Sequence, residues 1–90
     1  MQNLPIRVQA LVAAKRYLAA VALLNAIIPV VDYMTRARGV HTIVEIALRE
    51  GSIKSIVHIV EHFSFEVDTD TLTMIAPHVG TLLTNLPVAI

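Results

Sequence analysis

Apolar residues recur at intervals of three or four positions along most of this chain, and this spacing constrains the fold more than any other feature. Near the start, Val8, Leu11, Val12, Leu18 and Val21 lie three, four or seven positions apart, with basic residues between them. Because an α-helix has about 3.6 residues per turn, residues at these intervals share one helical face. We therefore predict an all-α fold, a small antiparallel helical-hairpin bundle of four to five helices.

Prolines and glycines mark the predicted boundaries of the first helix. Asn3 can cap a helix whose first turn holds Pro5, where the missing N–H of proline costs nothing. Pro29 should kink this helix or make it restart, because its ring crowds the preceding turn. Gly39 is typical of the residue that follows a helix end. We expect one long helix, interrupted at Pro29 and ending before Gly39.

Two segments, residues 40–47 and 53–60, repeat each other at an offset of thirteen, apolar on apolar and polar on polar. Gly51 suits a helix C-terminus and Ser52 a helix N-cap, which predicts a tight helix pair. The segments are also rich in β-branched residues, so residues 40–60 could form a β-hairpin instead. Adjacent apolar residues break the strict alternation that a hairpin needs, and this favours the helices.

The remaining residues predict one further helix. The run near residues 63–68 alternates between apolar and polar side chains, which indicates a possible short extended segment. Asp68 or Thr69 can cap a last helix, which Pro77 and Gly80 weaken in its middle. The apolar stripe of this helix would be Leu72, Ile75, Ala76, Val79, Leu82, Leu83 and Leu86.

The chain has more apolar residues than a domain of its size can bury. Of its 90 residues 56% are hydrophobic and 16% charged, against roughly 45–50% and about 25% in ordinary domains. No glycine- or serine-rich linker divides it, so residues 1–90 form one predicted domain. Because so short a chain leaves much of its surface in water, the excess predicts a contact surface. We expect a non-enzymatic protein–protein interaction or oligomerisation module, a homo-oligomer or a small subunit of a larger complex; the alternative is a carrier of an apolar ligand or lipid between amphipathic helices.

The first predicted helix is rich in alanine and is the candidate contact surface. Small side chains let another backbone approach closely, although alanines are also simply good helix formers. Beyond the alanines, the helix carries more apolar residues than one core stripe can use. The predicted interface residues are Ala13, Ala20, Leu24, Ile27 and Ile28.

One short sequence pattern is typical of a metal site. His58, Glu61 and His62 form an H-x-x-E-H sequence, which resembles the inverted zinc-protease signature over five residues. Nothing else in the chain resembles those much larger proteases. The competing interpretation, a solvated helix face, is favoured, so we predict no metal site and keep a histidine-based metal-binding protein as a further alternative. With three glycines and no phosphate-binding or nucleophile motif, we expect no enzyme and no cofactor.

Charge indicates what the chain contacts. The formal net charge is zero and no basic run occurs, so nucleic acid is not an expected partner. Residues 1–49 hold six basic residues against two acidic ones, and residues 50–90 hold one against five. Such oppositely charged halves attract each other, either inside one chain or between two copies. The expected partner is therefore the chain itself or another protein, with a small apolar ligand as the alternative.

Two absences shape the expected location. The chain has no cysteine, which excludes a disulfide framework and fits a reducing compartment. Its most apolar run, residues 18–31, is shorter than the about 20 residues that cross a bilayer. We expect no transmembrane segment and a cytoplasmic location.

Overall fold

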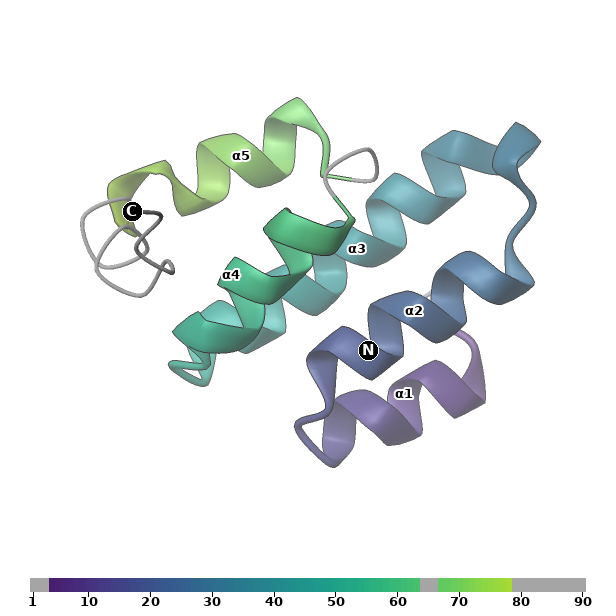
Figure 1. The fold of residues 1–90 in the computed structure, drawn as a ribbon, viewed down its shortest axis with the longest axis horizontal. Helices are drawn as coiled ribbons and strands as arrows, with labels where there is room; N and C mark the ends of the chain where they lie inside the picture. The colour runs from purple at the N-terminus through teal and green to yellow at the C-terminus, as the bar shows by residue number, and fades with distance from the viewer. Residues whose placement is uncertain (1–3, 64–66, 79–90) are drawn as a thin grey trace, which may run out of the picture.

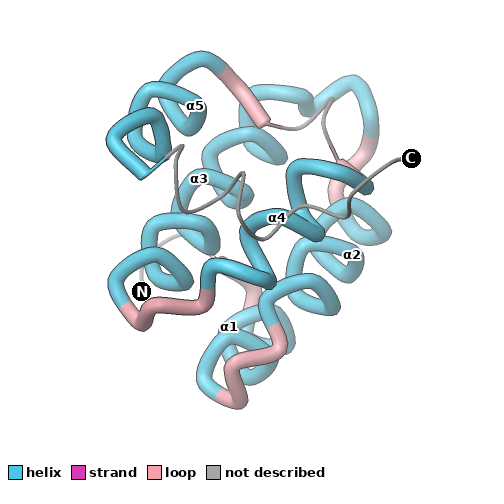
Figure 2. Tube along the Cα trace, turned by 60° about the vertical axis from the view of Figure 1, so that its left-hand side comes forward, coloured by secondary structure: helices cyan, strands magenta, loops and turns pink. Residues whose placement is uncertain are grey.

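A computed structural model describes residues 4–63 and 67–78 of the chain, and in these residues it contains helices and no strand. The predicted all-α fold is confirmed, and the β-hairpin alternative for residues 40–60 is wrong because both segments are helical (Figure 2). The five α-helices and two short 3₁₀ helices are α1 Ile6–Ala13, α2 Tyr17–Ile27, η1 Val30–Asp32, α3 Tyr33–Arg49, α4 Ile53–His62, α5 Thr69–Ile75 and η3 Ala76–His78.

Consecutive helices from α1 to α4 pack against each other, and α5 packs on α3 (Figure 1). Helix α2 contacts α1, α3 and α4, whereas α3 contacts α2, α4 and α5. The chain direction changes by 118° between α2 and the segment formed by η1 and α3. In Figure 1 this turn lies at one end of the long axis of the molecule, at the right of the view.

The expected single long helix before Pro29 is instead two helices, α1 and α2. The N–H of Arg16 donates to the carbonyl of Leu11 at 2.8 Å, and the N–H of Lys15 donates to that of Val12 at 2.9 Å. This Schellman arrangement ends α1 with Lys15 in the left-handed region, at φ 62°. The sequence gives no sign of the turn, because glycine normally occupies that position.

Gly39 does not end a helix, contrary to the sequence prediction, because α3 continues through it to Arg49. A Cβ built on Gly39 would lie 2.4 Å from Cδ2 of Leu24 on α2. The glycine therefore permits close contact between α2 and α3. The break at Pro29 is confirmed, since α2 ends at Ile27.

The turn between α3 and α4 repeats the Schellman arrangement with the expected residue. The N–H of Ser52 donates to the carbonyl of Ala47 at 2.8 Å, and the N–H of Gly51 donates to that of Leu48 at 3.1 Å. Gly51 has φ 74°, so its predicted role at the helix end is confirmed. Ser52 occupies the N-cap position of α4, but its side chain forms no capping hydrogen bond.

Helix α5 ends at Ile75, two residues before Pro77, and η3 follows it, as expected of a helix that Pro77 weakens. Asp68 is the N-cap of α5, as predicted, and accepts a hydrogen bond from the N–H of Thr71. Of the predicted stripe, Ile75 is buried, whereas Leu72 and Ala76 are exposed and the stripe from residue 79 onward lies outside the described residues. Phe63 and Val67 belong to no helix, and residues 64–66 of the expected extended segment also lie outside the described residues.

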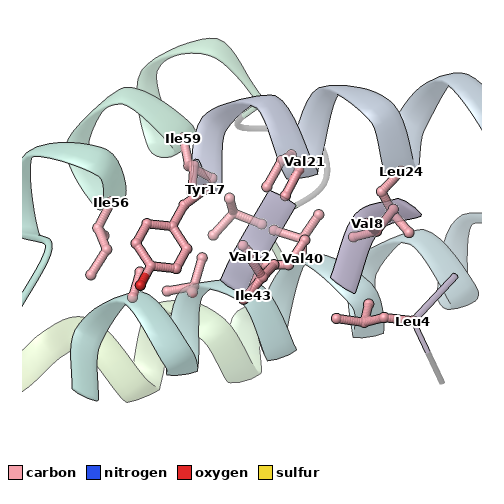
Figure 3. Close-up of a cluster of buried hydrophobic side chains, with 14 of the residues drawn as sticks. Leu4, Val8, Val12, Tyr17, Val21, Leu24, Val40, Ile43, Ile56 and Ile59 are labelled. Carbon is pink, nitrogen blue, oxygen red and sulfur yellow. The ribbon is translucent and has the colours of Figure 1, made fainter. Parts of the chain in front are cut away.

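The core lies where α1, α2, α3 and α4 meet (Figure 3). Figure 3 shows Val8 of α1, Leu24 of α2 and Val40 of α3 in this cluster, and Tyr17 beside Ile56. Burying an aliphatic or aromatic side chain of this kind contributes about 1.5–3 kcal/mol. Because α2 contacts three helices, core side chains occur along it from Tyr17 to Leu24.

Candidate functional site

Exposed apolar side chains gather where α2 turns into α3. Among the described residues, seven large apolar side chains are exposed, and five of them lie within eight consecutive positions. We call these five the apolar corner: Ile27, Val30, Val31, Tyr33 and Met34. Val31 is 95% exposed. An exposed apolar cluster of this kind marks a contact surface more often than isolated exposed residues do.

The local sequence explains why these side chains face water. Pro29 has no N–H to continue α2, and Ile28 before it is extended, with φ −103° and ψ 123°. The chain then forms η1 and begins α3. Because this connection lies at the end of the molecule, no other described helix covers it (Figure 1).

Arg36 holds the corner together. Its Nε donates to the carbonyl of Ile28 at 2.6 Å, and its Nη2 donates to the carbonyl of Asn25 at 2.5 Å. These carbonyls end α2, where a cation also interacts favourably with the helix dipole. The arginine of α3 therefore links the two helices on either side of the turn, and the apolar side chains are presented on a defined backbone.

Two opposite charges flank the corner. Asp32 is the first acidic residue in the chain, and Arg38 follows one and a half helical turns later. Both are exposed, and neither forms an ion pair with another described residue. Their charges are therefore available to a binding partner.

The predicted interface residues divide into two groups. Ala13 and Ile27 are exposed and Ile28 is partly buried, but Ala20 and Leu24 are 0% and 1% exposed. The last two lie in the core of the single chain, where no partner can contact them. In this structure they pack in the core of the single chain, because α2 contacts three other helices.

Sequence reasoning missed most of the apolar corner. The sequence predicts that the helix resumes after Pro29, but it does not assign Val30, Val31, Tyr33 and Met34 to a surface. The signal was present, because a proline that interrupts an apolar helix marks a turn and turns lie on the surface. Apolar residues that follow such a proline are therefore candidates for exposure.

The H-x-x-E-H residues do not form a metal site in this structure. His58, Glu61 and His62 are all exposed. The two imidazole rings stack with their centroids 6.2 Å apart, and Nδ1 of His62 is 2.9 Å from the carbonyl oxygen of His58. Within the part of the chain that the structure describes, no three metal-binding side chains come together.

A buried polar chain joins α5 to α3. The hydroxyl of Thr71, which is fully buried, donates to Oδ1 of Asp68 at 2.8 Å and lies 3.0 Å from Nδ1 of His41. Because the Thr71 hydrogen is used on the carboxylate, Nδ1 of His41 must carry the hydrogen it donates to Thr71. Burial raises the pKa of Asp68, but the backbone and hydroxyl hydrogen bonds from Thr71 and the charge of His41 outweigh it, and the pKa is lowered from 3.8. This chain fixes the start of α5 on α3.

Two hollows open to solvent lie between α3 and the segment formed by α5 and η3, and charged side chains line both. The first, of about 270 Å³, is lined by Arg38, His41, Thr42, Asp68 and Asp70. The second, of about 550 Å³, is lined by Glu45, Leu48, Arg49, Met74 and His78. Binding pockets for apolar ligands are lined mostly by apolar side chains, so neither hollow supports the lipid-carrier alternative.

Among the described residues, no helix is by itself both long and apolar enough to cross a bilayer, and α2 with the segment from Val30 to Arg49 meets the criterion only as a bent pair. Comparison of the chain with protein-family models, curated proteins and solved structures found no match in any of the three.

Proposed function

We propose that this protein is a non-enzymatic association module that buries its apolar corner against another folded chain. The observation that carries the proposal is the position of the five exposed side chains, which occupy one turn and the first residues of α3. Turns normally carry polar residues and glycine, because they lie in water. Burial of each aliphatic side chain of the corner would contribute about 1.5–3 kcal/mol at most.

The corner has no evident role in the fold, which supports a role in binding. None of its five side chains belongs to the buried core cluster. Packing in the core of the single chain therefore does not offset the free-energy cost of exposing these apolar side chains to water. The His41–Thr71–Asp68 chain, by contrast, is accounted for by the docking of α5 on α3.

The test is the molar mass of the purified chain, measured by light scattering across a range of concentrations. We expect the wild type to associate at high micromolar concentration and Val31→Glu to remain a monomer, because an unpaired carboxylate would be buried in the contact. The matched control is Leu72→Glu, which places the same charge on an exposed leucine of α5 outside the corner. A monomeric wild type at these concentrations, or equal effects of the two substitutions, would contradict the proposal.

A further inference from the structure

We propose that His58 and His62 of α4 chelate a divalent transition-metal ion of the zinc class. Nε2 of His62 and one ring nitrogen of His58 hold the ion, and water fills its other coordination positions. The site lies on α4, outside the apolar corner, so it does not depend on the proposed function. The sequence alone favours a solvated helix face for these residues, and the ring positions in the structure are what point to a metal site.

The spacing of the two histidines suits a chelate. Both lie within α4 and are four positions apart, so they share one face of the helix, with Cβ atoms about 5–6 Å apart. Two histidines at this spacing hold zinc in known helical metal sites. Imidazole nitrogen is also a preferred ligand of zinc and copper.

The two imidazole rings are already close to the separation that a shared ion requires. Their centroids lie 6.2 Å apart, and their planes differ by 10°. With Zn–N bonds of about 2.0–2.1 Å, two imidazoles on one zinc ion have centroids about 5 Å apart. The rings therefore need to approach each other by only about 1 Å. Rotation of the side chains can supply this, because both histidines are exposed.

One hydrogen bond sets the tautomer that a metal ligand needs. Nδ1 of His62 lies 2.9 Å from the carbonyl oxygen of His58. Because a carbonyl oxygen only accepts, Nδ1 of His62 carries the hydrogen, and in the neutral ring Nε2 then has a free lone pair. Metal-binding histidines commonly donate their other N–H to a carbonyl or a carboxylate in this way. Among the described residues, no group bonds to Nε2 of His62.

Glu61 favours a cation on this face without being a ligand. It is exposed, it lies three positions after His58, and it forms no ion pair with another described residue. Its negative charge therefore attracts a cation to this side of α4. In the part of the chain that the structure describes, no three metal-binding side chains come together, so the protein supplies two ligands here.

A site with two protein ligands binds less tightly than a closed structural site. Structural zinc sites use four protein ligands, whereas here water completes the coordination. We therefore expect an ion that exchanges with solvent and stabilises the fold only when its free concentration exceeds the Kd. Mg²⁺ should not bind, because it prefers oxygen ligands.

The experiment is a Zn²⁺ titration of the full chain, without a histidine tag, followed by the NMR signals of the imidazoles and by the thermal midpoint. Zn²⁺ should shift the signals of His58 and His62 together and raise the midpoint, and a chelator should reverse both effects. His58→Ala and His62→Ala should each weaken binding about tenfold or more, because the second histidine no longer binds within the same molecule. The control is His78→Ala, which removes an exposed histidine outside α4 and should leave binding unchanged.

A rescue variant tests the spacing itself. Lys54→His in the His62→Ala background places an imidazole four positions before His58, on an exposed part of α4, and should restore binding of Zn²⁺. Lys54→Ala in the same background removes the same charge and should not restore it. Both single histidine variants change exposed side chains, so the helical content measured by circular dichroism should persist.

Three results would overturn the inference. They are a wild type that binds no Zn²⁺ at millimolar concentration, an equal loss of binding in His78→Ala and His62→Ala, and a Lys54→His variant that fails to restore binding. A loss in Glu61→Ala as large as that in His62→Ala would likewise exclude a chelate made by the two histidines alone. None of these results changes the molar mass expected for Val31→Glu, so the proposed function is tested separately.

Discussion

The two ends of α2 are both turns, but they differ in the residues they expose. At its start, the turn from α1 presents Lys15 and Arg16 to water, and the Lys15 ammonium lies 3.6 Å from the carboxylate of Glu50. At its end, the apolar corner presents isoleucine, valine and methionine side chains to the same solvent. The first turn exposes charged side chains, as loops usually do, whereas the second exposes apolar side chains.

This difference shows where the apolar excess of the chain is placed. The excess is not spread evenly over the described surface, because five of seven exposed large apolar side chains lie at one turn. Departures from local sequence rules tend to occur at functional sites, where selection for binding outweighs selection for solubility. The polar turn is explained by the fold alone, whereas the packing of the described core does not account for the corner.

The largest expected effect contrasts two apolar residues of α2 that lie three positions apart. Leu24→Ala should lower the free energy of unfolding by about 2–5 kcal/mol, because it leaves a cavity in the core. Ile27→Ala should lower it by less than about 1 kcal/mol in the monomer, since this side chain is 49% exposed. Urea unfolding at low protein concentration measures both. Equal losses would mean that the corner belongs to the fold.

The next effect tests the close contact between α2 and α3. Gly39→Ala should destabilise the protein by about 1–3 kcal/mol, because its methyl group would overlap Leu24. In the Leu24→Ala background the same change should cost much less or stabilise, since alanine favours a helix by about 1 kcal/mol over glycine. A double-mutant cycle of unfolding free energies gives the coupling. Additive effects would exclude the proposed overlap.

An effect of similar size concerns the polar chain that fixes α5. Thr71→Val should cost about 1–3 kcal/mol, because Asp68 and His41 both lose a hydrogen-bond partner. Thr73→Val is the control, since its hydroxyl is exposed and bonds only within α5. Thermal unfolding of the two variants should separate them clearly, and similar melting temperatures would show that the polar chain does not stabilise α5.

The same site predicts a pH dependence. The folded pKa of Asp68 lies below its usual value of 3.8, so the carboxylate binds protons less readily in the folded chain. Its contribution to stability is therefore present above pH 3.8 and is lost as the pH falls toward the lowered folded pKa. Thr71→Val should reduce this acid sensitivity, and an unchanged acid unfolding profile would contradict the assignment.

The smallest effect compares two turns of the same geometry. Lys15→Gly should stabilise the protein by about 1 kcal/mol, because it removes the cost of a left-handed lysine, less the small contribution of an exposed ion pair. Gly51→Ala should have the opposite sign, since Gly51 is also left-handed and a Cβ there meets no atom within 4 Å. Changes of the same sign in the two variants would exclude backbone strain as the cause.

The elements that the sequence predicts well are those whose signals are local. The helix pair joined at Gly51, the break at Pro29 and the cap at Asp68 each depend on the chemistry of one or two residues. The end of α1 at Lys15 could not be predicted, because a lysine stands at the left-handed position where glycine is usual.

The candidate site was predicted only in part, for a related reason. Periodicity identifies which residues of α2 are apolar, but it does not say that Leu24 would be buried and Ile27 49% exposed. Burial depends on which helices pack together, and that information is absent from the pattern of any single segment. The sequence shows that the residues after Pro29 are apolar. Their exposure follows only from the direction in which the chain turns there.

The most direct test of the account is the urea unfolding midpoint of the wild type and of Val31→Glu, each measured at low and at high protein concentration. If the corner serves association and not the fold, the two midpoints coincide at low concentration, because residue 31 is 95% exposed in the single chain. At high concentration the midpoint of the wild type rises, since association between folded copies stabilises the folded chain, while the midpoint of the variant does not rise. A wild-type midpoint independent of concentration, or a variant already destabilised when dilute, would contradict the account.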